Sequence, residues 1–184
     1  MGQEWLGEIK NGSCSRTALR LICAGGSAIL CVMLTIRTAT ETDLPALAHL
    51  WHEKMLLQAD ARTTLAVNAR ERWLDAAKSW LSDPQCGFFA AEREGEVLGY
   101  VVGWLQSLPG LMPEQIGMIA EIVIDGHGYH GGAGRELVSA LRGWFAAHGA
   151  SQTAVQTPHY DAVAQAFWRS LGATEWTDVL WIKS

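Results

Sequence analysis

Hydrophobic and polar positions along residues 33–184 follow two periods, and each period predicts one type of element. Alternation and short apolar runs predict strands at 34–40, 86–92, 97–105, 116–125, 152–157 and 174–182. Apolar residues at helical spacing predict helices over 44–55, 73–81, 137–148 and 161–171. The predicted order, β-α-α-β-β-β-α-β-α-β, is that of one compact α/β domain.

Turn and capping residues separate these elements. Thr42 and Asp43 are the predicted caps of the first helix, and Asp83-Pro84 is expected to end the second. The segment 93–96, Arg-Glu-Gly-Glu, predicts a hairpin turn between two strands. Because 116–125 is apolar almost throughout, we expect a central strand that is covered on both faces.

The first 32 residues differ from the rest and are treated as an N-terminal extension of a domain over 33–184. Residues 18–36 are largely apolar, which is typical of a membrane anchor or a signal peptide, but Arg20 and Gly25-Gly26 interrupt the run. In a third interpretation the natural start is Met33 and the upstream residues are an artefact of start-site choice. Membrane association is expected only if 18–36 is a genuine anchor.

Composition narrows the partners and the compartment. The net charge of −5 argues against a nucleic-acid binder, which normally presents a basic face. The four cysteines form no C-x-x-C pair and have no zinc-ligand spacing with histidine, so neither a metal site nor a disulfide framework is predicted. A cytoplasmic location follows as the default. The oligomeric state stays open, with a homodimer as one alternative.

A glycine-rich segment, "YHGGAGREL" at 129–137, lies between a predicted strand and a predicted helix. Glycine allows the backbone angles that aim several amides at one point and removes Cβ atoms from the approach path. The amides of a first helical turn have no intrahelical acceptor, and the helix dipole adds positive potential there. The segment is therefore either a phosphate-binding loop, to which Arg135 would add charge, or a flexible turn without a ligand.

Two motifs in the right order give residues 33–184 a resemblance to the GCN5-related N-acetyltransferase (GNAT) family. The family has a strand, a loop Q/R-x-x-G-x-G/A and then a helix; here Tyr129 stands at the Q/R position and Gly132 and Gly134 at the small positions. A later helix of the family carries N-x-x-A-x-x-F-Y, where this chain has Asp161 at the start and Trp168 at the tyrosine position. The resemblance implies a mixed, mostly antiparallel central sheet flanked by helices.

The resemblance also implies acetyl-CoA as co-substrate. Its pantetheine would pair with the backbone of 122–124, and its pyrophosphate would lie on the amides of 130–135. The residues that this assigns to cofactor binding are Ile122, Val123, Ile124, Tyr129, His130, Gly131, Gly132, Ala133, Gly134, Arg135, Asp161 and Trp168. Three of them, Tyr129, Asp161 and Trp168, depart from the family's pattern. Asp161 has a second interpretation, as the cap of its helix.

Two residues are candidates for the chemistry. Glu121 matches a strand glutamate that serves the family as a base, directly or through water; the alternative is a structural ion pair with an arginine. Trp168 replaces the tyrosine that is the family's frequent general acid, and an indole cannot supply a proton to a thiolate. Tyr160 is the nearest substitute, with a capping aromatic as its alternative role.

The sequence therefore predicts an N-acetyltransferase that moves an acetyl group from acetyl-CoA to a primary amine of a small molecule or peptide. The alternative is a non-catalytic domain that binds acyl-CoA. The segments 56–68 and 106–115 are expected to shape the acceptor pocket, and Asp60 and Glu114 hint at a cationic acceptor. Cys86 is expected to be a small core residue rather than a nucleophile.

Overall fold

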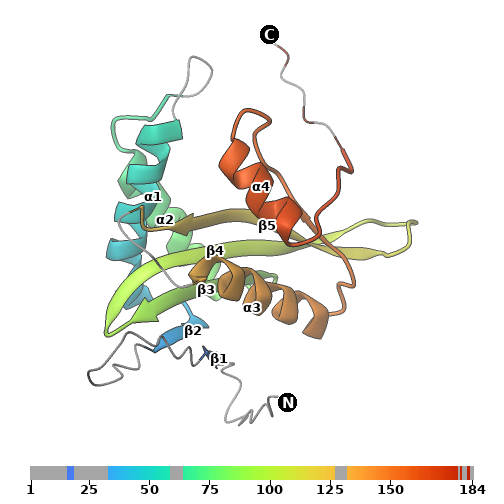
Figure 1. Cartoon of the computed structure of the whole chain (residues 1–184), viewed down its shortest axis with the longest axis horizontal. Helices are drawn as coiled ribbons and strands as arrows, with labels where there is room; N and C mark the ends of the chain where they lie inside the picture. The colour runs from blue at the N-terminus through green and yellow to red at the C-terminus, as the bar shows by residue number, and fades with distance from the viewer. Residues whose placement is uncertain are drawn as a thin grey trace, which may run out of the picture. The chain divides into compact units, whose positions relative to one another are not determined.

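The structure, a computed structural model, describes residues 16–18, 33–58, 64–126, 132–177, 179 and 182. Contacts within the chain separate two compact units, Met1–Ala154 and Val155–Ser184, and each is described by itself. Among the described residues, the first unit contains all of the central sheet but its last residue, and three of the four α-helices (Figure 1). The glycine-rich loop residues Tyr129, His130 and Gly131 lie outside the described residues.

The sheet runs in sequence order. Its strands are β1 (Arg16–Ala18), β2 (Leu34–Thr38), β3 (Cys86–Arg93), β4 (Glu96–Ser107), β5 (Gln115–Ile124) and β6 (Thr153–Val155), in the order β1-β2-β3-β4-β5-β6. The four pairings from β1 to β5 are all antiparallel. The prediction of a mixed α/β fold with a mostly antiparallel sheet is confirmed.

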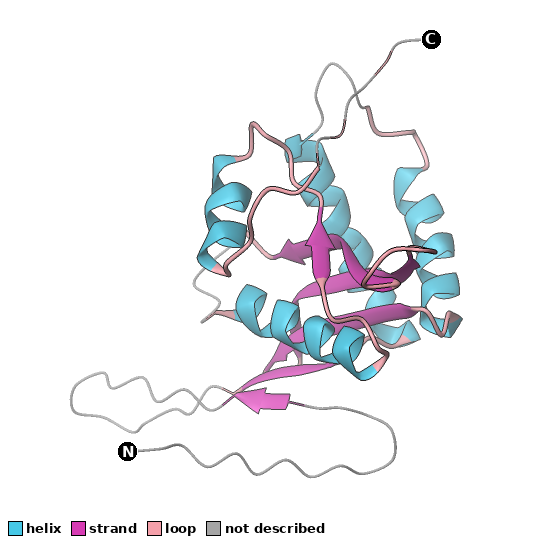
Figure 2. Cartoon of the chain, turned by 90° about the vertical axis from the view of Figure 1, so that its right-hand side faces the viewer, coloured by secondary structure: helices cyan, strands magenta, loops and turns pink. Residues whose placement is uncertain are grey.

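Helices cover both faces of this sheet. The short helix η1 (Glu41–Asp43) leads into α1 (Leu44–Gln58), and α2 (Ala69–Ser82) follows; both α-helices contact β3, β4 or β5. Helix α3 (Ala133–Ala147) contacts β3, β4 and β5 from the opposite face, as Figure 2 shows. Helix α4 (Ala162–Ser170) belongs to the second unit.

The α1/α2 face of the sheet carries an aromatic core. Trp73 of α2 stacks on Trp51 of α1, with ring centroids 5.9 Å apart, and meets Trp80 edge-on at 5.5 Å. Below them, Tyr100 of β4 lies 5.6 Å from Trp73 and 5.8 Å from Phe88 of β3. Large aromatic side chains contribute most of the burial on this face.

The α3 face is lined by glycines instead. A Cβ atom on Gly117 of β5 would lie 2.2 to 2.6 Å from three ring atoms of Phe145, and one on Gly103 of β4 would lie 2.9 Å from the same ring. A Cβ on Gly87 of β3 would meet Leu141 and Trp144 at 2.5 and 2.8 Å. The missing side chains let α3 lie against the backbone of three neighbouring strands.

Several predicted turns and helix ends are confirmed. Glu94 and Gly95 of the β3–β4 hairpin both have positive φ, 53° and 82°, as a tight two-residue turn requires. Gly149 and Gly172, which follow α3 and α4, have φ of 90° and 86°. Helix α2 ends at Ser82, immediately before Asp83.

Two details of the prediction were wrong. The N-cap is Thr40, at the start of η1, and not Thr42; Asp43 does take part in the capping box, because its carboxylate accepts a hydrogen bond from the Thr40 amide at 2.8 Å. The final strand expected at 174–182 is absent from residues 174–177, 179 and 182, which are the described part of that segment. Alternation there predicted a strand from pattern alone, and the described residues of this segment have no strand pairing.

The N-terminal extension is described only at Arg16–Ala18, which pairs with β2. The remainder of residues 1–32 lies outside the described residues, so the interpretations of this segment stay predictions. In the described part of the chain, no helix combines the length and apolarity that a membrane crossing needs.

Candidate active site

Glu121 lies on β5 beside an irregularity of the sheet. Along β4, Val102 is opposite Glu121 but the next residue, Gly103, is opposite Ile119, so Ala120 is an extra residue on β5. Such a bulge bends its strand and re-aims the neighbouring side chains, and bulges are frequent next to active sites. Here the bulge sets the direction of Glu121.

The Glu121 carboxylate is held by two aromatic donors. Tyr100 donates its hydroxyl to Oε2 at 2.7 Å, and Trp73 donates its indole N–H to the same oxygen at 3.3 Å. Oε1 accepts no hydrogen bond from the described residues. The alternative role of Glu121, an ion pair with an arginine, was therefore wrong for the described residues: its partners there are Tyr100 and Trp73.

Burial keeps Tyr100 in its donor form. The side chain is fully buried, and this burial, followed by the negative charge of Glu121, raises the pKa of Tyr100 well above the ordinary value. The phenol is neutral across the physiological range and donates to the carboxylate. Tyr100 and Trp73 are functional candidates that sequence reasoning missed, because nothing local marks their polar atoms as partners of Glu121.

The three residues predicted to pair with pantetheine follow Glu121 directly. Val123 is buried, whereas Ile122 and Ile124 are half-buried. The Ile122 carbonyl accepts a hydrogen bond from the Lys54 ammonium of α1 at 2.7 Å. Neighbouring β6 has three residues against ten in β5, so it is too short to pair with the whole of this edge. A carbonyl has two lone pairs, and one of those on Ile122 is left for a further donor.

The start of α3 has the backbone that the glycine motif predicts. Gly132 at the N-cap is left-handed, with φ of 91°, and its carbonyl accepts from the amides of Arg135 and Glu136. The amides of Ala133 and Gly134 precede these and have no intrahelical acceptor, as at any helix start. Ala133 is 1% exposed, so the helix start is anchored in the core while Arg135 is exposed. These features fit an anionic ligand.

The remaining candidates lie in the second unit. Asp161 caps α4 by accepting from the Ala164 amide at 2.9 Å, which confirms its capping role. Trp168 is buried, with 7% of its surface exposed, and contacts Phe167 edge-on. Tyr160 is 65% exposed in the turn before α4. The roles proposed for Tyr160 and Trp168 in catalysis and cofactor binding stay predictions.

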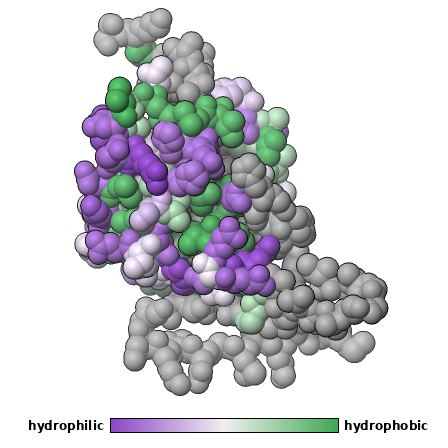
Figure 3. Space-filling view, turned by 90° about the vertical axis from the view of Figure 1, so that its left-hand side faces the viewer, coloured by the Kyte–Doolittle hydropathy of each residue, from purple (hydrophilic) through white to green (hydrophobic). Residues whose placement is uncertain are grey.

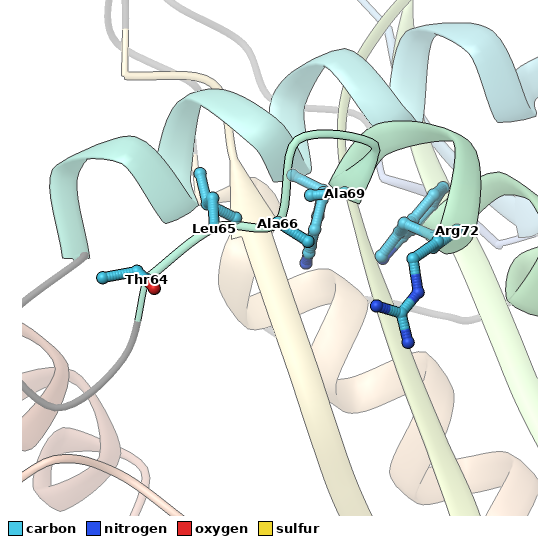
Figure 4. Close-up of a pocket in the computed structure, with 7 residues that line it drawn as sticks. Thr64, Leu65, Ala66, Ala69 and Arg72 are labelled. Carbon is cyan, nitrogen blue, oxygen red and sulfur yellow. The ribbon is translucent and has the colours of Figure 1, made fainter.

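A hollow of about 340 Å³ opens beside the aromatic core of the α1/α2 face (Figure 4). Its lining residues are Trp51, Thr64, Leu65, Ala66, Ala69, Arg72 and Trp73. Part of the predicted acceptor segment 56–68 thus forms one wall. This volume is in the range of small-molecule sites. Figure 3 shows hydrophilic and apolar side chains intermingled on this side of the molecule.

Cys86 at the start of β3 is not a nucleophile candidate. Its side chain is buried, and burial together with the nearby charge of Asp83 raises the pKa of the thiol to about 12. A thiol in this state carries almost no thiolate at neutral pH. The prediction that Cys86 is a core residue is confirmed.

Comparison with known proteins gives a family and a fold. The model of the acetyltransferase (GNAT) family matches residues 48–173, which is more than half of the chain. No curated protein matches the chain significantly. Many solved structures match the chain significantly. The three described below are less than 20% identical to it, so they are evidence for the fold alone.

Three of these structures illustrate the range. Aminoglycoside N-acetyltransferase AAC(6')-Iy in complex with CoA is 17% identical with a TM-score of 0.69, over 83% of this chain and 95% of that one. A transcriptional regulator from Bacillus halodurans C-125 is 19% identical with a TM-score of 0.67, over 82% and 99%. A predicted acetyltransferase with acetyl-CoA from Clostridium acetobutylicum is 10% identical with a TM-score of 0.68, over 82% and 96%.

Proposed function

The chain belongs to the acetyltransferase (GNAT) family, and on that premise we propose that it transfers an acetyl group from acetyl-CoA to a primary amine of a small molecule or peptide. The observation that carries the proposal is the Glu121 carboxylate, aimed by a bulge and fixed by Tyr100 and Trp73. A carboxylate in a mostly apolar strand is costly unless it has partners or a task. The cytoplasm is the proposed location, since the cysteine pattern gives no disulfide framework.

The proposed binding of acetyl-CoA uses the backbone of β5 and of α3. The outer edge of 122–124 would pair with the pantetheine amides as an added strand does, and the amides at Gly132–Arg135 would hold the pyrophosphate. The left-handed Gly132 and the amides that lack intrahelical acceptors fit this assignment. When bound, acetyl-CoA supplies an activated thioester.

In the proposed step, Glu121 accepts the proton that the attacking amine must lose, either directly or through one water. The C–N bond forms, the C–S bond breaks, and the sulfur leaves as a thiolate that takes a proton from Tyr160 or from water. In this proposal, Oε1 of Glu121 accepts the proton, while Oε2 stays hydrogen-bonded to Tyr100 and Trp73. Those two side chains act as positioning residues, because they fix the carboxylate and do not touch the reacting atoms.

The amine itself is not assigned by the fold. Several of the solved neighbours are aminoglycoside acetyltransferases, so an aminoglycoside is one candidate acceptor. An amino acid or a peptide amine is another. The hollow beside Trp73 is the proposed acceptor site, because Trp73 links its wall to Glu121.

Calorimetry and turnover of the full chain test the proposal. We expect acetyl-CoA to bind, and free CoA to appear when a panel of primary amines is supplied. Glu121→Gln should lower kcat about 100-fold, the lower limit of typical acid–base effects, with acetyl-CoA affinity unchanged. Glu53→Gln, which alters a half-buried carboxylate on α1 whose partner is His49, serves as the control. Unchanged kcat in Glu121→Gln would remove the base but leave the transfer reaction standing.

The alternative is a domain that binds acyl-CoA without using it. Trp168 at the usual tyrosine position favours this candidate, because an indole cannot protonate the leaving thiolate. Acetyl-CoA binding without release of CoA, across the whole amine panel, would decide for the alternative. Absence of binding would remove both functions.

A further inference from the structure

We infer that the acceptor is an amine that also carries a carboxylate, as an amino acid does, and that Arg72 binds this carboxylate. The inference deepens the proposed function and rests on it for the acetyl transfer. It concerns the hollow between α1, the segment before α2 and the first turns of α2. Two observations support the inference: the charge of Arg72, and the aromatic wall that Trp51 and Trp73 form.

Arg72 carries the only formal charge among the described residues that line the hollow. Figure 4 shows its side chain extending away from α2 into open space. The guanidinium makes no hydrogen bond or ion pair with any residue in the described part of the chain. Arginine presents a planar fork of donors that matches a carboxylate in two parallel hydrogen bonds.

The neighbouring cations of the fold are engaged elsewhere. Arg70, two residues earlier on α2, donates to the Pro45 carbonyl at 3.2 Å, and Lys54 donates to the Ile122 carbonyl at 2.7 Å. Lys78 lies six residues beyond Arg72 and is 3.6 Å from the Asp75 carboxylate. Among the described residues of this region, Arg72 is thus the cation that lines the hollow and whose guanidinium has no hydrogen-bond or ion-pair partner.

The charge of the hollow disfavours a polycationic acceptor. An acceptor with several ammonium groups would meet a guanidinium and, among the described lining residues, no carboxylate that compensates it. Like charges disfavour binding, and an acceptor with a carboxylate converts that repulsion into an ion pair. Of the two residues that hinted at a cationic acceptor, Glu114 does not line the hollow and Asp60 lies outside the described residues.

The rest of the wall suits an apolar or aromatic body. Leu65, Ala66 and Ala69 line it together with the stacked rings of Trp51 and Trp73. Trp73 donates to the carboxylate of Glu121 at 3.3 Å, so the wall adjoins the proposed base. An aromatic or aliphatic amino acid would place its carboxylate at Arg72, its side chain against the tryptophans and its amine toward Glu121.

The test compares three acceptors that share a benzyl group and a primary amine: phenylalanine, phenylalaninamide and phenethylamine, with kanamycin as the polycationic comparison. Each is assayed with the full chain and acetyl-CoA by release of free CoA. Because the basicity of the three amines differs, the informative quantity is the change for each acceptor when Arg72 is replaced. Lys78→Gln is the matched control, since it removes one positive charge from the same helix.

Arg72→Gln is expected to lower kcat/KM for phenylalanine about tenfold, the low end for a charge-assisted pair, and to change the other two acceptors less than about twofold. Arg72→Glu should make kcat/KM higher for phenethylamine than for phenylalanine. Lys78→Gln should leave kcat/KM unchanged for all three acceptors. Equal losses for all three acceptors, or turnover of kanamycin in preference to phenylalanine, would overturn the inference and leave acetyl transfer intact.

Calorimetry separates the ligand class from the transfer function. Binding of phenylalanine that needs Arg72, without release of CoA, would support the ligand class and contradict the transfer function. If phenylalanine is neither bound nor turned over, the inference is overturned.

Discussion

The two faces of the central sheet are built on different principles. On the α3 face, side chains of the helix lie directly on strand backbone, because Gly103 and Gly117 leave room for the ring of Phe145. On the α1/α2 face, the space is filled by aromatic rings, and their polar atoms reach Glu121. The first face specifies the fold by shape, and the second combines packing with a buried polar network.

The difference predicts that the two faces fail in different ways. A close-packed interior has no room for added atoms, so changes on the α3 face should act on stability. A hydrogen-bonded carboxylate can be altered with little change in volume, so changes at Glu121 should act on turnover. Gly117→Ala and Tyr100→Phe test this division, and Asp43→Asn tests a buried carboxylate whose partners serve the fold; they follow from the largest expected effect to the smallest.

Gly117→Ala is expected to lower the free energy of unfolding by about 3 kcal/mol, the upper part of the range for overpacking. The added Cβ would lie 2.2 Å from a ring atom of Phe145, a fully buried side chain that also borders Gly103. Urea denaturation followed by tryptophan fluorescence measures the change.

Gly126→Ala is the control for Gly117→Ala, because a Cβ there meets nothing within 4 Å. It should alter the unfolding free energy by no more than about 0.5 kcal/mol. Equal effects of the two substitutions would show that α3 does not depend on the glycines beneath it. Under native conditions, the activity per folded molecule of Gly117→Ala should stay near that of the wild type.

Sequence patterns predicted the elements of both faces but not how either face packs. The place of Glu121 on a strand and the turn at Glu94-Gly95 follow from local signals, since a few neighbouring residues decide them. The partners of Glu121 could not be predicted, because Tyr100 and Trp73 lie 21 and 48 residues away in the chain. An apolar pattern marks both as core residues without saying that their polar atoms meet one carboxylate.

The bulge at Ala120 was missed for a related reason. A bulge is a property of the pairing between two strands, and the sequence of β5 alone shows only an apolar run. The final strand at 174–182 was predicted from alternation, which cannot indicate whether a partner strand exists. The loop residues Tyr129 and His130 lie outside the described residues, so their assignment to cofactor binding stays a prediction.

Asp43→Asn should lower the free energy of unfolding by about 2 kcal/mol at neutral pH, the range of hydrogen bonds to a charged group. Asp43 is 5% exposed and holds the start of α1 against β2, where Arg37 donates to both of its oxygens at 2.6 and 2.8 Å. Burial alone would favour the neutral acid, but the hydrogen bonds from Arg37 and Thr40 outweigh it and lower the pKa of Asp43.

The pH dependence of this effect has a defined sign. Because the pKa of Asp43 is lower in the folded than in the unfolded state, its contribution is complete above the ordinary value of about 3.9 and is lost as the pH falls through the folded-state value. The difference in the free energy of unfolding between wild type and Asp43→Asn should therefore be constant from pH 6 to 8 and shrink below about pH 4. Asp75→Asn, an exposed change on α2, should cost no more than about 0.5 kcal/mol at any pH. A gap that widens toward acid pH would contradict the assignment.

Tyr100→Phe is the smallest change and the sharpest test of the α1/α2 face, because it removes one oxygen and keeps the ring. We expect a loss of about 1 kcal/mol in the free energy of unfolding, the typical contribution of one hydrogen bond. Since burial and then the charge of Glu121 raise the pKa of Tyr100, the loss should not vary between pH 6 and 9. Above about pH 10, the unfolded wild type gives up its phenol proton while the folded state keeps it, so the advantage over Phe should narrow.

Turnover then separates a positioning role of Tyr100 from a purely structural one. If Tyr100 acts through Glu121, Tyr100→Phe should lower kcat about 3- to 10-fold in the wild type, in proportion to the lost hydrogen bond. The same substitution should have no further effect on kcat in Glu121→Gln, because the group that it positions is gone. Equal losses in both backgrounds would show that Tyr100 affects turnover without Glu121. An unchanged kcat of Tyr100→Phe in the wild-type background would instead show that this hydrogen bond serves the fold, as the glycines of the α3 face do.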